Sequence, residues 1–309
     1  ENSREIEIYD IFHDECKEDG YWHCFIFLPR KKQGELFDLL QIPRRNLDYF
    51  DFIHFSDIGH NCKSHYKKPL LIKSWSTIFL YAIQQQKIKA QLFLGYKNKE
   101  YDCQLIQGND AKIGAKLVVL RETKNHQDMY SQMRINKKIE TTFLMGIKGG
   151  VKFLFFDEEI KIGKIYIDSL KRALEENFNT QNILERFKSE ADENITFNDD
   201  AEIIPIYKKN YKKNDLVSEF MQLADVVIGA IRTQKLKMRS FPIRYEITKP
   251  FKDLLEKEME NLPRMQNSRY YKGFALSDTW IEDNKWKFEN MNTNVKEDEC
   301  QNLPFDKSS

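Results

Sequence analysis

Three aspartates stand at positions where simple burial would favour an apolar side chain. Asp14 ends the alternating segment REIEIYDIFHD and shares strand parity with Phe12. Asp157 directly follows the apolar run VKFLFF, and Asp225 interrupts the apolar stretch FMQLADVVIGAI. Because a buried carboxylate is costly unless it is paired, hydrogen-bonded or bound to a metal, we expect these residues to converge around a cation.

The chemistry expected of such a cluster is metal-assisted hydrolysis of phosphodiester bonds. Mg²⁺ and Mn²⁺ prefer carboxylate and water oxygens, and two such ions about 4 Å apart can stabilise the attacking water and the leaving oxygen. We predict two Mg²⁺ or Mn²⁺ ions, the metal ligands Asp14, Asp157, Glu158 and Asp225, and the catalytic residues Asp14, Glu15, Asp157 and Asp225. The alternative is that the strand-end aspartates form turns and Asp225 pairs with an arginine.

Alternating strands and helices would have to position these groups. Residues 4–14 and 21–29 predict a strand hairpin. Other strands are predicted at 88–95, 151–156 and within 195–207, and helices at 33–41, 69–86, 165–177 and 215–234, with helical spacing over 112–145. Gly229, one turn beyond Asp225, would let the last of these helices pack closely against a strand. The order of elements favours an α/β layered fold.

The composition supports a folded protein and limits its partners. The chain has 309 residues, of which 41% are hydrophobic, so it can bury a core. Its 49 Lys and Arg nearly cancel its 48 Asp and Glu, so nucleic acid would have to be bound by local basic patches. No apolar run is long enough to span a bilayer, and five thinly spread cysteines fit reduced thiols. We expect a cytoplasmic protein with no membrane partner.

Two basic segments near Asp225 in the sequence could hold a nucleic-acid strand. They are YKKNYKK at 207–213 and RTQKLKMR at 232–239. Lys and Arg can neutralise phosphates, and Tyr can stack on unpaired bases. The predicted nucleic-acid-binding residues are Lys208, Lys209, Tyr211, Lys212, Lys213, Arg232 and Lys235. The alternative is that these segments are solvated surface.

A second grouping, rich in histidine, raises the question of zinc. His54, His60, Cys62 and His65 fall within twelve positions. Their spacing lacks the paired CxxC or HxxxH arrangement of strong zinc motifs, which argues against a structural zinc site. The alternatives are ordinary loop histidines, or His13 and His60 assisting proton transfer near the acidic site.

Several of these segments together resemble the RNase-H-like proteins known as domain of unknown function 3800. In that family the first strand typically ends in an Asp-Glu pair, which FHDECKEDG matches at Asp14-Glu15. A late helix carries a Leu-Gln-Leu-Ala-Asp-like motif, which MQLADVVIGAI matches at 221–231, and a middle strand ends in an acidic residue, which VKFLFFDEE matches at Asp157. HFSDI at 54–58 is also similar to a segment common there. The resemblance implies an RNase-H-like sheet and nuclease activity.

We therefore predict an α/β fold with an RNase-H-like mixed β-sheet flanked by helices. Residues 1–262 would form the nuclease domain with helical insertions, and 263–309 a peripheral C-terminal extension and mobile tail. The predicted function is divalent-metal-dependent hydrolysis of DNA or RNA, with a protein partner that could supply specificity. The alternatives are a noncatalytic nucleic-acid- or protein-binding subunit and a zinc-stabilised interaction module.

Overall fold

The centre of the protein is a mixed β-sheet built around an N-terminal hairpin. The computed structural model describes residues 5–17, 20–59, 62, 66–83, 91–97, 100–106, 113–122, 132–155, 158–168, 179–252, 255, 273–282 and 285–290. The sheet strands are β1 (Glu7–Cys16), β2 (Tyr21–Pro29), β5 (Lys116–Glu122), β6 (Ile160–Asp168), β7 (Ile195–Phe197), β8 (Ile203–Ile206), β9 (Phe274–Glu282) and β10 (Lys285–Asn290). The order across the sheet is β10-β9-β5-β2-β1-β6-β7, with β8 also paired to β6.

Both parallel and antiparallel pairs occur in this sheet. β2 runs antiparallel to its neighbours β1 and β5. β6 runs parallel to β1, and both β7 and β8 run parallel to β6. Because β1 and β6 are parallel neighbours, their carboxyl ends meet at the same edge of the sheet.

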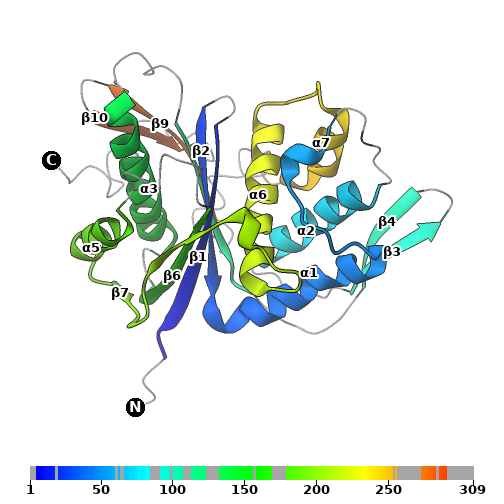
Figure 1. Ribbon diagram of the computed structural model, residues 1–309, viewed down its shortest axis with the longest axis horizontal. Helices are drawn as coiled ribbons and strands as arrows, with labels where there is room; N and C mark the ends of the chain where they lie inside the picture. The colour runs from blue at the N-terminus through cyan, green and yellow to red at the C-terminus, as the bar shows by residue number, and fades with distance from the viewer. Residues whose placement is uncertain are drawn as a thin grey trace, which may run out of the picture.

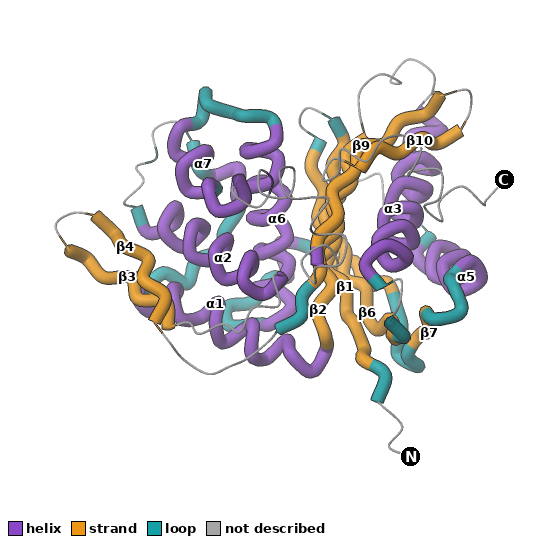
Figure 2. Tube along the Cα trace, turned by 180° about the vertical axis from the view of Figure 1, so that it is seen from behind, coloured by secondary structure: helices purple, strands orange, loops and turns teal. Residues whose placement is uncertain are grey.

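Helices cover the two faces of the sheet (Figure 1). One face carries α1 (Gln33–Leu47), α2 (Lys67–Ile83), α6 (Leu216–Lys235) and α7 (Pro242–Ile247), and the other carries α3 (Gln132–Leu154) and α5 (Thr180–Glu190). The separate hairpin of β3 (Gln91–Lys97) and β4 (Glu100–Ile106) lies beside α1 and α2, away from the sheet (Figure 2). Short 3₁₀ turns are η1 (Arg30–Lys32), η2 (Phe55–Asp57) and η4 (Lys208–Asn210).

Strand parity in the hairpin divides the buried side chains into two cores. Phe12 and Cys24 face the core that contains α6, whereas Ile11 and Phe25 face the core that contains α3. Each register pair of the antiparallel ladder lies on one face, as Asp14 and Cys24 do. Neighbouring residues of β1 therefore present their side chains to different helices.

Most predicted elements are confirmed. The hairpin forms at 7–29, and the helices expected at 33–41, 69–86 and 215–234 form as α1, α2 and α6. The strand within 195–207 forms as β7 and β8, and the strand expected at 88–95 appears as β3. Residues 274–290, from the segment expected to be peripheral, supply β9 and β10, of which β9 pairs in parallel with β5. The structure thus has the expected α/β architecture with a mixed sheet between helices.

Three predictions are wrong, and all of them concern the middle of the chain. Helical spacing was expected over 112–145, but residues 116–122 form strand β5. Residues 151–154, the start of the expected VKFLFF strand, form the last turn of α3 instead. Their apolar residues continue a helical series in which Phe143, Ile147, Val151 and Leu154 are buried. The expected helix at 165–177 begins inside β6, which ends at Asp168. A short apolar run does not by itself distinguish a buried strand from a buried helix.

Candidate metal and catalytic site

Two carboxylates meet at the carboxyl ends of β1 and β6. The parallel register pairs Phe12 with Tyr166 and His13 with Ile167, which places Asp14 beside Asp168 at the next step. The rings of Phe12 and Tyr166 stack with centroids 5.0 Å apart, so these two residues lie on the same face of the sheet. Asp14 and Asp168 follow them by two positions on their strands and therefore lie on that face as well. Asp14 and Asp168 are both buried and lie on the side that α6 covers.

Asp225 reaches the same place from α6. This helix crosses the sheet over β1, where the ring of Phe220 meets that of Phe12 edge-on at 5.0 Å. Asp225 follows by five residues, and its side chain is 14% exposed. Burial raises the pKa of Asp14 well above its usual value, and the negative charges of Asp225 and Asp168 raise it further. We call Asp14, Asp168 and Asp225, whose charges act on one another, the carboxylate cluster.

Asp168 was not predicted, whereas Asp157 was. Asp157 lies outside the described residues. Asp168 ends the segment IKIGKIYID, whose buried isoleucines lie on β6, and this pattern was the sequence evidence for a strand that ends in an acid. The structure brings together Asp14 and Asp225 of the predicted set and adds Asp168.

The QLAD segment of α6 clamps the chain that precedes η2. Asp225 Oδ2 accepts hydrogen bonds from the backbone N–H of Phe55 at 2.6 Å and from Nδ1 of His54 at 2.8 Å. One helical turn earlier, Gln222 Oε1 accepts the backbone N–H of Ile53 at 2.7 Å. Because Gln222 and Asp225 are three residues apart on one face of the helix, they bind one extended strand of backbone.

Gly229 makes this close approach possible. A Cβ built on Gly229 would lie 2.2 Å from Cδ1 of Phe55, far inside van der Waals contact. The sequence predicted that Gly229 would allow close packing of this helix against a strand. The structure corrects the partner, since it is the Phe55 ring that occupies the space over Gly229.

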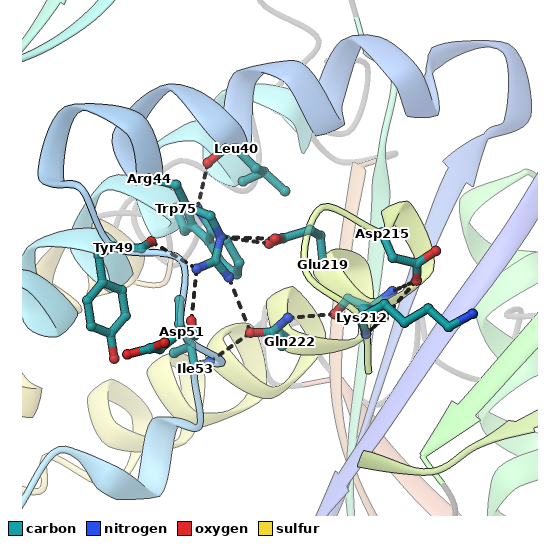
Figure 3. Close-up of polar contacts among 11 residues, drawn as sticks. Leu40, Arg44, Tyr49, Asp51, Ile53, Trp75, Lys212, Asp215, Glu219 and Gln222 are labelled. Carbon is teal, nitrogen blue, oxygen red and sulfur yellow. Dashed lines mark hydrogen bonds and ion pairs between the residues drawn. The ribbon is translucent and has the colours of Figure 1, made fainter. Parts of the chain in front are cut away.

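A buried arginine contacts the neighbouring part of α6 and the chain that leads to His54 (Figure 3). Arg44 of α1 forms an ion pair with Glu219, with Nε 2.9 Å from Oε1, and donates to Oε1 of Gln222 at 3.2 Å. It also donates to the backbone carbonyls of Tyr49 and Asp51. Arg44 therefore ties α1, α6 and the chain leading to His54 into one unit.

Charge on the cluster is balanced by two nearby groups. Burial works to raise the pKa of Asp225, but the hydrogen bond and charge of His54 outweigh it, so that pKa is lowered. The hydrogen bond to Asp225 in turn raises the pKa of His54. Lys208 places Nζ 3.6 Å from Oδ2 of Asp168 and 3.4 Å from Nε2 of His54. Although burial opposes it, the charges of Asp14, Asp225 and Asp168 raise the pKa of Lys208.

Among the predicted nucleic-acid-binding residues, Lys208 and Tyr211 lie beside the cluster, whereas Lys213 pairs with Asp51. Lys208 and Lys209 belong to η4, and Lys212 and Lys213 follow it; all four are exposed. Tyr211 is partly buried among them, and burial followed by the charges of Asp168, Asp14 and Asp225 raises its pKa. Exposed amines next to a carboxylate cluster could hold phosphate groups at its edge.

The structure separates the other predicted residues from this cluster. Glu15 lies on the opposite face of β1, where it accepts a 2.5 Å hydrogen bond from the hydroxyl of Tyr21. Glu158 lies at the opposite end of β6 from Asp168 and pairs with Lys116 at 3.1 Å. These two assignments are corrected, because strand parity and strand length respectively keep the carboxylates apart.

The basic residues of α6 also need a correction. Arg232 is buried and donates from Nη1 to Sγ of Cys16 at 2.5 Å, so it does not present a guanidinium to phosphate. Lys235, in the last turn of α6, is partly exposed. In the histidine-rich grouping for which zinc was considered and disfavoured, His60 and His65 lie outside the described residues, and His54 is bonded to Asp225.

The residues at the cluster have the right donors for a hard divalent cation. Asp14, Asp168 and Asp225 offer carboxylate oxygens, which suit Mg²⁺ and Mn²⁺. Asp225 Oδ2 carries both hydrogen bonds described above, so Oδ1 is the oxygen left for a cation. Burial, together with the negative charge of Asp225, raises the pKa values of Asp14 and Asp168, and a bound cation would relieve the repulsion from that charge.

Comparison with known proteins adds no identity to this description. No protein-family model matches the chain. No curated protein matches it either. Within the part of the chain that the structure describes, no helix has the length and apolar character needed to cross a membrane. The fold and site define an α/β protein with a buried carboxylate cluster at the carboxyl edge of a mixed sheet.

Proposed function

We propose that the protein is a divalent-metal-dependent nuclease with an RNase-H-like fold. The observation that carries this proposal is the convergence of Asp14, Asp168 and Asp225 from two parallel strands and a late helix. Three carboxylates at one partly enclosed site repel one another unless a cation is present. Carboxylates that meet in this way could hold the divalent ions that metal-assisted phosphodiester hydrolysis uses.

In this proposal the three aspartates hold Mg²⁺ or Mn²⁺. When bound, such ions supply Lewis-acid stabilisation and an activated water. Asp225 orients His54 by accepting a hydrogen bond from its Nδ1, which leaves Nε2 of His54 facing Lys208. Lys208 contributes a positive charge beside Asp168, and the exposed lysines Lys209, Lys212 and Lys213 bind the sugar-phosphate backbone. DNA and RNA both fit this chemistry.

The RNase-H-like part of the proposal rests on where the motifs lie. The first strand ends with Asp14, the helix with the QLAD motif crosses that strand, and a parallel neighbour of the first strand ends with Asp168. These are the three positions at which the resemblance places acidic residues, with the middle strand now assigned to β6 in place of residues 151–156. The HFSDI segment supplies His54 and Phe55, the two groups that bind Asp225.

The test is cleavage of single-stranded, double-stranded and hybrid substrates in the presence of Mg²⁺, Mn²⁺ or a chelator. Asp168→Asn is the informative variant, because Asp168 belongs to the cluster and lies beside Lys208. Asparagine has nearly the same shape as aspartate but lacks its negative charge. We expect a loss on the order of 10³-fold, since metal-ion catalysis contributes several kcal/mol. The matched control is Asp57→Asn. It removes an exposed carboxylate of η2, which pairs with Lys68 of α2. Cleavage by Asp168→Asn at the parent's rate would refute the proposal.

A second candidate function is supported by the position of Lys208. Its ammonium group already lies among the carboxylates and could neutralise them without a metal ion. The protein would then be a noncatalytic subunit that binds nucleic acid through the lysines around η4. Substrate binding that is equal with chelator and with Mg²⁺ or Mn²⁺, accompanied by no cleavage, would favour this candidate.

A further inference from the structure

A second polar cluster occupies the face of the β1–β2 hairpin that lies opposite the aspartates. His13 and Glu15 are two residues apart on β1, and Glu15 is the register partner of His23 on β2. Directly paired side chains on one face of an antiparallel ladder are close enough to touch. One nitrogen of each imidazole and one carboxylate oxygen of Glu15 all lie within 4.8 Å of one another.

The hydrogen bonds within this cluster leave donor and acceptor atoms unused. Nε2 of His13 and Nδ1 of His23 share a 2.9 Å hydrogen bond. His13 Nδ1, His23 Nε2 and Glu15 Oε1 are buried and have no hydrogen-bond partner among the described residues. Each such atom costs about 1–3 kcal/mol when it is left without a partner. Three of them at one place are costly for packing alone, and Glu15 Oε1 is the one among them that could join the two facing nitrogens as a ligand.

The surroundings hold these donors in place and exclude most water. The His13 ring contacts Phe25 at 4.6 Å and Phe143 of α3 at 4.9 Å between centroids. His13 is 3% exposed and His23 is fully buried. The hydroxyl of Tyr21 occupies Oε2 of Glu15, which leaves Oε1 as the free oxygen of that carboxylate. Carboxylates that bind metals are characteristically fixed by such a hydrogen bond.

We propose that His13, Glu15 and His23 form a zinc-binding site, separate from the aspartate cluster. Two imidazoles and one carboxylate suit Zn²⁺, whereas Mg²⁺ and Mn²⁺ prefer all-oxygen ligands. Ligand nitrogens on tetrahedral zinc lie about 3.3 Å apart, given Zn–N bonds of about 2.0–2.1 Å. The facing nitrogens, Nε2 of His13 and Nδ1 of His23, are 2.9 Å apart, close to this spacing. As zinc ligands they would give up the hydrogen bond that they share, and the ring protons would lie on Nδ1 of His13 and Nε2 of His23. Three protein ligands leave a fourth position for water.

The test measures zinc binding by the purified full-length chain after treatment with a chelator. Competition with a chromogenic chelator gives the stoichiometry and affinity, and Co²⁺ gives an absorption spectrum that reports the ligands. We expect one Zn²⁺ per chain for the parent. Glu15→Gln and His23→Gln should bind zinc at least 100-fold more weakly, and Tyr21→Phe about 10–100-fold more weakly, because Tyr21 only positions Glu15.

Two control variants separate this site from the proposed nuclease site. Asp14→Asn changes a residue between the two β1 ligands but on the other face, and His54→Gln removes an exposed imidazole. Both variants should bind zinc with the affinity of the parent. The zinc measurement therefore tests this site whether or not the protein cleaves nucleic acid. Circular dichroism verifies that each variant is folded. The proposal would be overturned if the chelator-treated parent did not bind added zinc. It would also be overturned if Glu15→Gln and His23→Gln both bound zinc with the affinity of the parent.

Discussion

Gly229→Ala should destabilise the protein, although the same change in most helices is stabilising. Replacing Gly by Ala inside a helix ordinarily gains about 1 kcal/mol. Here the added Cβ would lie 2.2, 2.3 and 2.8 Å from Cδ1, Cγ and Cε1 of Phe55. Carbon atoms pack best at roughly 3.5–4.0 Å, so the ring must move by more than an ångström.

The Phe55 ring has little room for that movement. Its side chain is almost fully buried, and its backbone N–H is held by Asp225 at 2.6 Å. Overpacking a core of this kind costs about 1–3 kcal/mol. The contacts here are far shorter than van der Waals distances, so the cost should lie at the upper end of that range, about 2–3 kcal/mol. After the helix-propensity gain of about 1 kcal/mol is subtracted, the free energy of unfolding should fall by about 1–2 kcal/mol, and more if the hydrogen bond to Asp225 is lost.

Urea denaturation measures this change, with Gly34→Ala as the matched control. Gly34 lies in α1 with no atom within 4 Å of a Cβ, so alanine there should be neutral or stabilising. Adding Phe55→Leu to Gly229→Ala should recover part of the loss, which would give a coupling energy between the two positions. If Gly229→Ala is as stable as the parent, the close contact between α6 and η2 is wrong, and with it the placement of His54 beside Asp225.

Two further predictions concern buried charges. Arg44→Met should lower the free energy of unfolding by about 3–5 kcal/mol in urea denaturation, because it leaves the carboxylate of Glu219 buried without its ion-pair partner. The double variant Arg44→Met, Glu219→Leu should be markedly more stable than Arg44→Met alone, and equal stability of these two variants would contradict the role of the ion pair. Asp14 has a folded-state pKa raised well above its usual value, so in chelator its contribution to stability is complete below about pH 4 and is lost as the pH rises through the folded-state pKa. Asp14→Asn should therefore gain stability relative to the parent as the pH rises, and Mg²⁺ should reduce that gain; parallel stability curves for the two proteins would show that Asp14 does not titrate in this way.

The N-terminal hairpin and α6 could be predicted from the sequence because their patterns have one physical solution. The alternation over 7–14 and the aromatic, β-branched run at 21–29 indicate a strand hairpin, which the structure buries on both faces. The apolar face of 216–235 indicates a buried helix. Asp14 and Asp225 could then be predicted as site residues, because each one interrupts such a pattern. Both residues occupy the positions on β1 and α6 that these patterns predict.

The middle of the chain could not be resolved in the same way. VKFLFF is apolar at every position except one, so it fits a buried strand and a buried helical turn equally well. Gly163 added to the difficulty. It lies against Arg30 and Asp10, in a part of β6 where the register with β1 shifts and the alternation of buried residues is broken. Asp168 was missed for that reason, although its position after a run of isoleucines resembles that of Asp14.

Contacts between distant segments were the least accessible to sequence reasoning. Arg232 has the composition of a phosphate-binding residue, yet it is buried against Cys16 of β1. His54 was grouped with its sequence neighbours as a possible zinc ligand, yet its partner Asp225 is 171 residues away. Gln222 and Asp225 did carry usable evidence. Their spacing of three puts both acceptors on one helix face, and such a pair can bind an extended backbone only if some segment is brought beside it.

Strand β1 links the two proposals, because its alternation assigns neighbouring residues to different chemistry. Asp14 faces α6 and the carboxylate cluster, whereas His13 and Glu15 face α3 and the imidazole of His23. The two sites therefore differ in ligand type as well as in face, with oxygen donors on one side and mixed nitrogen and oxygen donors on the other. A hard cation and a zinc ion would each select its own side of the same strand. Substitutions one residue apart on β1 should consequently affect different metals, a separation that a single mixed site could not produce.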